Sequence, residues 1–129
     1  MLNIGKIINC PAASYEQTLV TLASNSDHVA IILSYSGAYW TSQLCEQLRK
    51  KKIPVILITR AGVKEESADN VYHLFISDNE NLQNRISQFS SHIAMQYIMD
   101  VLYGAIYNLN RTKNNHYIRK SMSYHNPNQ

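Results

Sequence analysis

The chain has 129 residues, enough for one domain with a substantial core and too few for a two-domain enzyme. Apolar residues make up 45% of it, no stretch approaches the roughly 20 apolar residues of a membrane span, and the N-terminus lacks the shape of a signal peptide; we predict a cytoplasmic protein without membrane contact. The formal net charge is +3, but neither a helix-turn-helix pattern nor interleaved aromatic and basic residues accompany the basic clusters, which argues against nucleic-acid binding. Cys10 and Cys45 form no CxxC pair and the five histidines have no short ligand spacing, so we expect no disulfide framework, metal site or cofactor.

The first half of the chain alternates predicted strands and helices. Residues 4–10 form a short predicted strand, and residues 15–24 a helix. Residues 29–33 are uninterruptedly apolar, which is typical of a parallel strand covered on both faces. A second helix is predicted over residues 39–52. The residues expected on the buried faces of the two helices are Leu19, Leu22, Ala23, Trp40, Leu44 and Leu48.

The second half begins with another buried strand, at residues 55–58, and a less buried one at residues 71–76, joined by a short polar segment. One long amphipathic helix is predicted from residue 83 or 84 to residue 109. Its apolar stripe is too wide to face one sheet, which fits either a homodimer interface or a helix lying across its own domain. Residues 110–129 are polar and basic, and we expect them to be frayed or flexible.

The junction after the 29–33 strand is the best functional clue. The strand breaks into Ser34, Tyr35, Ser36 and Gly37 just before a predicted helix start. Open α/β sheets bind ligands at the carboxyl ends of their strands, and the free N–H groups of a helix start favour anions. Serine and glycine also form ordinary turns and N-caps, so the tetrapeptide alone allows both interpretations.

Several blocks of the chain resemble one known family. They are Asp27 with VAIILSYSG, then PVILITRAG, SADNVYHL and RISQFSSHIAMQYIMDVLYGAIY. Their order is similar to that of the SIS (sugar isomerase) domain, and the last block is most similar to the C-terminal domain of RpiR-type transcriptional regulators. The resemblance covers residues 1–109. It implies a three-layer α/β fold around a doubly wound parallel sheet, as in flavodoxin. The sheet would lack its usual first strand, and the domain would end in a long C-terminal helix.

The resemblance also implies a function, the non-catalytic binding of a phosphorylated sugar by a regulator whose DNA-binding head is not in this chain. A homodimer through the C-terminal helix is expected. By position, the phosphate would be held by Ser34, Ser36, Gly37, Ala38 and Thr41. Further residues that could contact the ligand are Tyr39, Thr59, Glu80, Arg85, Ser90 and Ser91.

Two departures from the family pattern bear on this site. Ala38 and Tyr39 stand where the family has Glu-Thr, and Thr41 comes two residues later. Because a helix turns about 100° per residue, Thr41 would point some 200° away unless the helix starts later. The missing first strand would lie between the strands at residues 4–10 and 29–33, so we expect those two to pair directly or another chain to cover the edge.

Three alternatives remain at this point. A sugar-phosphate isomerase would need a general base, for which Glu80, Glu46 and His73 are the available groups. A flavodoxin-like mononucleotide binder would use the same hydroxyl-rich loop. A degenerate SIS fragment would act only in dimerisation.

Overall fold

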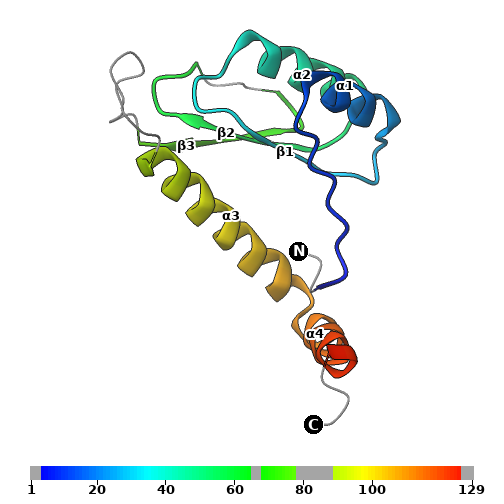
Figure 1. Ribbon diagram of the computed structural model, residues 1–129. Helices are drawn as coiled ribbons and strands as arrows, with labels where there is room; N and C mark the ends of the chain where they lie inside the picture. Colours follow the sequence, from blue (N-terminus) through cyan, green and yellow to red (C-terminus); the bar gives the residue numbers. More distant parts are fainter. Residues whose placement is uncertain (1–3, 65–67, 78–88, 126–129) are drawn as a thin grey trace. The chain divides into compact units, whose positions relative to one another are not determined.

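The computed structural model describes residues 4–64, 68–77 and 89–125 (Figure 1). Its elements in chain order are α1 (Ser14–Ala23), β1 (Ala30–Leu33), α2 (Tyr39–Lys50), β2 (Val55–Arg60), β3 (Val71–Ile76), α3 (Phe89–Leu109) and α4 (Arg111–His125). The chain divides into two compact units, Pro11–Gln96 and Met1–Cys10 with Tyr97–Gln129. The fold is α/β, with a parallel sheet in the first unit and a long helix, α3, towards the C-terminus.

The sheet has three parallel strands in the order β1-β2-β3. Its register pairs Ala30 with Val55 and Leu33 with Ile58, and then Val55 with Val71 and Arg60 with Ile76. The central strand β2 is the most buried, since Val55, Ile58 and Thr59 have no exposed surface. The predictions of a buried strand at 55–58 and a less buried strand at 71–76 are confirmed.

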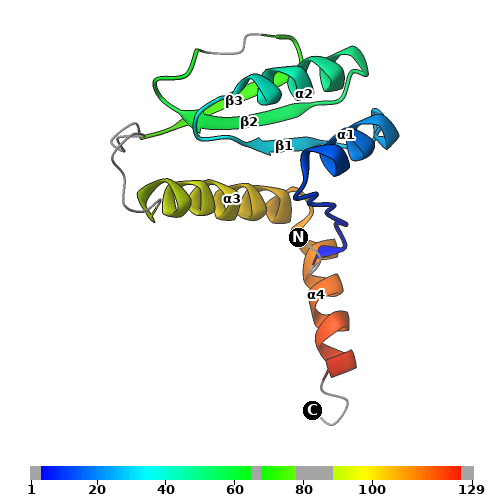
Figure 2. The same cartoon turned by 45° about the horizontal axis from the view of Figure 1, so that its top comes forward.

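Helices α1 and α2 lie over the same face of this sheet (Figures 1 and 2). The stripe predicted for α2 is confirmed by Leu44 and Leu48, which are buried. The third member of the stripe, Trp40, is 37% exposed, and its Nε1 donates a hydrogen bond to Gln17 Oε1 of α1 at 2.9 Å. The core beneath α2 consists of Cys45, Leu48, Ile53, Val55 and Leu57, with Ala30, Ile32 and Val71 packed against it.

The face predicted for α1 is wrong, because Leu19 and Leu22 are 46% and 61% exposed and Ala23 is exposed as well. The helix is held instead by polar contacts at its C-terminus. Lys51 Nζ donates to Thr21 O at 2.9 Å, to Ser24 O at 3.1 Å and also to Leu22 O. A cation here satisfies carbonyls that have no partner within the helix and complements its dipole.

Strand β1 lies at an edge of the sheet, pairing with β2 alone among the described strands. The expected cover on both of its faces is incomplete, since Leu33 is 48% exposed and Val29, directly before the strand, is 61% exposed.

Helix α2 ends two residues earlier than predicted, in a left-handed turn. Lys52 has a φ of +57°, its N–H donates to Arg49 O at 2.9 Å, and Ile53 N–H donates to Leu48 O at 3.0 Å. This pair of bonds is the Schellman motif, which satisfies the last carbonyls of a helix. Ile53 has no exposed surface and packs in the same core cluster as Leu48, so the turn sends the chain directly into β2.

The first strand predicted from the sequence is absent. Ile4 is buried in a turn, Gly5 takes a left-handed φ of +72°, and residues 6–10 are exposed and irregular. A lone extended segment gains nothing without a neighbouring strand to satisfy its backbone groups, and no described strand pairs with it. Direct pairing of residues 4–10 with residues 29–33 is thus not observed.

In the second unit, α4 replaces the irregular tail expected after residue 109. Asn110 begins this helix, with its Oδ1 accepting from Lys113 N–H at 3.3 Å. The buried Asn114 side chain donates from Nδ2 to Tyr107 O at 2.8 Å, which satisfies a carbonyl near the end of α3. These caps overcome the weak apolar pattern of residues 111–125. Among the described residues, no helix is long and apolar enough to cross a membrane.

Candidate functional site

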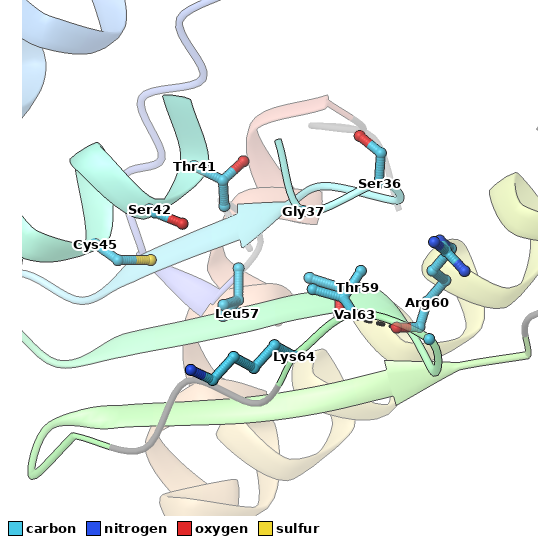
Figure 3. Close-up of a pocket in the computed structure, with 11 residues that line it drawn as sticks. Ser36, Gly37, Thr41, Ser42, Cys45, Leu57, Thr59, Arg60, Val63 and Lys64 are labelled. Carbon is cyan, nitrogen blue, oxygen red and sulfur yellow. Dashed lines mark hydrogen bonds between the residues drawn. The ribbon is translucent and has the colours of Figure 1, made fainter. Parts of the chain in front are cut away.

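A cavity of about 320 Å³ opens at the carboxyl ends of β1 and β2 (Figure 3). Its walls come from the β1–α2 junction, the first turns of α2, the end of β2 and the loop that follows β2. The hydroxyl and cationic residues that line it are Ser36, Thr41, Ser42, Thr59, Arg60 and Lys64, and the others are Gly37, Cys45, Leu57, Gly62 and Val63. The cavity lies where parallel α/β sheets bind their ligands.

The β1–α2 junction is a tight turn built around Gly37. Its φ of +61° is in the left-handed region, and its N–H donates to Ser34 O at 3.3 Å. A Cβ at this position would lie 2.5 Å from Val63 Cγ1, so the loop after β2 packs directly on the glycine. Only a residue without a side chain fits this turn without displacing Val63.

The N-terminus of α2 has no side-chain cap. Ala38 is its N-cap, and no side chain caps the first turn. Backbone N–H groups at such a helix start can therefore donate to an anion. The Gly37 N–H, which was expected to help, is already engaged in closing the turn.

Thr41 points towards the β1 end. Helix α2 begins at Tyr39, as predicted, so Thr41 is its third residue, and its hydroxyl reaches Ser34 rather than pointing away from the junction. Thr41 is buried, lines the cavity, and donates from Oγ1 to Ser34 Oγ at 2.8 Å.

The other residues expected around the phosphate separate into two groups. Ser36 and Gly37 line the cavity, whereas Ser34 does not and serves as the hydrogen-bond acceptor of Thr41. Ala38 and Tyr39 are exposed and lie outside the lining, and Tyr39 has 79% of its surface accessible.

Thr59 lies at the floor of the cavity with no exposed surface. Its Oγ1 donates to Arg60 O at 3.1 Å and lies 2.8 Å from His73 Nε2, which donates to it when the ring proton is on that nitrogen. The His73 ring also packs on Phe75, with the ring centroids 4.2 Å apart. Of the candidate general bases, His73 thus contacts the cavity residue Thr59 but does not itself line the cavity.

Glu46 is an exposed residue of α2 outside the cavity lining. Its carboxylate pairs with Lys50 Nζ at 2.8 Å. The hydrogen bond from Lys50 and the positive charge of that side chain lower the pKa of Glu46 below its ordinary value. Glu46 lies on the exposed side of α2 in an ion pair and is therefore not positioned to act as a general base in the cavity.

The remaining expected residues lie away from the cavity or outside the described residues. Ser90 is exposed and Ser91 is buried near the start of α3, and neither lines the cavity. Glu80 and Arg85 lie outside the described residues.

Six of the lining side chains were not among the site residues predicted from the sequence: Ser42, Cys45, Leu57, Arg60, Val63 and Lys64. Arg60 could have been found, because it ends a buried strand next to the one that ends in Ser34, and such ends meet at one edge. Lys64 and Val63 carry no such signal, since they lie in a loop of irregular conformation. No cluster of three His, Cys, Asp or Glu suited to a metal occurs in the part of the chain that the structure describes.

Compared with models of known protein families and with curated protein sequences, the chain matches none.

Proposed function

We propose that this chain binds a phosphorylated sugar without converting it, as the effector-sensing domain of an RpiR-type regulator with an SIS-like, doubly wound fold. The observation that carries the proposal is the cavity at the carboxyl ends of β1 and β2. It combines a glycine turn, several hydroxyls and two cations, it lies beside an uncapped helix start, and no acidic residue is among its described lining.

These groups suit a phosphate in particular. Hydroxyl and backbone N–H groups can donate hydrogen bonds to a charged oxygen. Ser36 and Thr41 supply the hydroxyls nearest the helix start, and the Thr41 hydroxyl, which donates to Ser34 Oγ, would turn from Ser34 to the phosphate. The sugar class follows from the resemblance of the sequence blocks to the SIS family.

The proposal includes a homodimer through α3. Ile93, Tyr97 and Val101 are spaced at four residues along this helix, and each is more than half exposed. Such a stripe of large apolar side chains is typical of a helix that packs against another subunit. Sedimentation velocity of the wild type and of Val101→Glu tests this part; a monomeric wild type would contradict it.

The binding proposal is tested by thermal shift and calorimetry with hexose and pentose phosphates. A ligand at 100 times its dissociation constant adds about 2.7 kcal/mol to the free energy of unfolding, which raises the melting temperature by several degrees. Ser36→Ala should weaken binding about tenfold, since it removes a hydrogen bond to a charged group. Ser26→Ala, a serine in an exposed turn outside the cavity, is the matched control and should bind as the wild type does.

The competing functions give different results in the same assays. Turnover of an aldose or ketose phosphate would favour the isomerase, and a shift with flavin mononucleotide alone would favour the mononucleotide binder. No shift with any phosphorylated sugar would contradict the proposal and favour a fragment that acts only in dimerisation.

A further inference from the structure

The two cations of the cavity lie at opposite ends of it. In Figure 3 the Arg60 guanidinium is on the same side as Ser36, whereas Lys64 Nζ extends the other way, towards the side of Ser42 and Cys45. Arg60 ends β2, and Lys64 lies four residues further along the loop that packs on Gly37 through Val63.

We propose that the ligand carries two separated anionic groups, as a sugar bisphosphate or a phosphorylated sugar acid does. This inference rests on the proposed function and specifies the class of sugar phosphate that the cavity takes. The phosphate lies at the end formed by Ser36, Arg60 and the start of α2. The second anionic group lies at the Lys64 end.

The positions of the Arg60 and Lys64 charges favour a ligand with two separated anionic groups. A single phosphate held at one end leaves the other cation without an anionic ligand group, because the two point away from each other along the cavity. The described lining contains no carboxylate to attract a second positive group of the ligand, and its hydroxyls suit the uncharged middle of a sugar. A volume of about 320 Å³ is within the range of small-molecule sites.

Lys64 is the residue to test, because it is exposed and its removal leaves the core intact. Isothermal titration calorimetry compares fructose 6-phosphate with fructose 1,6-bisphosphate, and glucose 6-phosphate with 6-phosphogluconate. In each pair the second ligand should bind the wild type about tenfold more tightly, a difference of 1.4 kcal/mol. Lys64→Gln should abolish that preference while the affinity for the member of each pair that has a single anionic group changes by less than about twofold.

Lys50→Gln is the matched control, since this lysine is exposed on α2 outside the cavity and should leave the preference unchanged. The preference should also shrink as salt rises from 0.1 to 1 M, because the Debye length falls from about 10 to about 3 Å. Equal affinities within each pair, or an equal loss for both members in Lys64→Gln, would overturn the inference and leave the proposed function standing. Failure of all four ligands to bind would overturn the inference, and failure of every hexose and pentose phosphate in the thermal-shift screen as well would overturn both.

Discussion

The contact between Gly37 and Val63 determines the shape of the cavity, and replacing Gly37 with alanine tests it. Gly37 has a left-handed φ of +61°, and the new Cβ would lie 2.5 Å from Val63 Cγ1 and 3.1 Å from Cγ2. Both the backbone and the packing therefore oppose the alanine. The expected result is a less stable protein with a distorted cavity.

The magnitude follows from two contributions. A left-handed backbone costs an L-residue about 1–2 kcal/mol, of which the lower entropy of the unfolded alanine chain offsets about 0.4–1 kcal/mol. That leaves about 1 kcal/mol. Forcing a methyl group into a packed contact adds about 1–3 kcal/mol. Gly37→Ala should therefore lower the free energy of unfolding by about 2–4 kcal/mol.

A double-mutant cycle separates the two contributions. Val63→Ala removes both γ-methyl groups, so the packing penalty should disappear in Gly37→Ala/Val63→Ala while the backbone penalty remains. Urea denaturation of the wild type, the two single variants and the double variant should show a favourable coupling of about 1–3 kcal/mol. Additive effects, within about 0.5 kcal/mol, would show that the loop after β2 does not pack on the turn and would refute the reasoning.

Three further predictions concern α2 and its surroundings. Lys52→Gly should raise the free energy of unfolding by about 0.5–1 kcal/mol, because glycine takes the left-handed φ of +57° without strain; a lower urea midpoint would contradict this. Lys51→Met should cost about 1.5–3 kcal/mol in chemical denaturation, since it removes the ammonium that caps α1, whereas an equal loss in Lys51→Arg would show that the charge is not the cause. The lowered pKa of Glu46 means that its ion pair stabilises the fold above the ordinary carboxylate pKa and stops doing so as the pH falls through the folded value. The small difference in melting temperature between wild type and Glu46→Gln should thus be present at pH 7 and disappear on acidification, once Glu46 is protonated; a difference that is unchanged across the acid range would contradict this.

The local hydrophobic pattern was sufficient to predict the helices and strands that pack against neighbours close in the sequence. The unbroken apolar run at 55–58 and the alternating segment at 71–76 became β2 and β3, and two of the three residues of the stripe at spacing four became the buried face of α2. These features repeat with the period of the backbone, so they can be recognised one segment at a time.

The failures occurred where stability depends on a distant partner. Residues 4–10 have the composition of a strand, but a strand also needs a neighbour, and the sheet has none for them among its described strands. Residues 111–125 have the composition of a tail, but the Asn110 and Asn114 side chains cap the helices on either side of the turn. Leu19 and Leu22 fit a buried face, yet α1 is anchored by Lys51, 29 residues or more further along the chain.

The candidate site likewise combines features that local sequence predicts with features that depend on distant contacts. The sequence by itself determined that hydroxyls lie at the carboxyl edge of a parallel sheet, because Ser34 and Ser36 follow an apolar strand directly before a helix start. Only the tertiary structure decided which groups share the cavity. Val63 lies on Gly37, and Lys64 lies across from Arg60, because the loop after β2 folds back over the junction. No periodic pattern encodes such a loop, since its conformation depends on the surfaces that it meets.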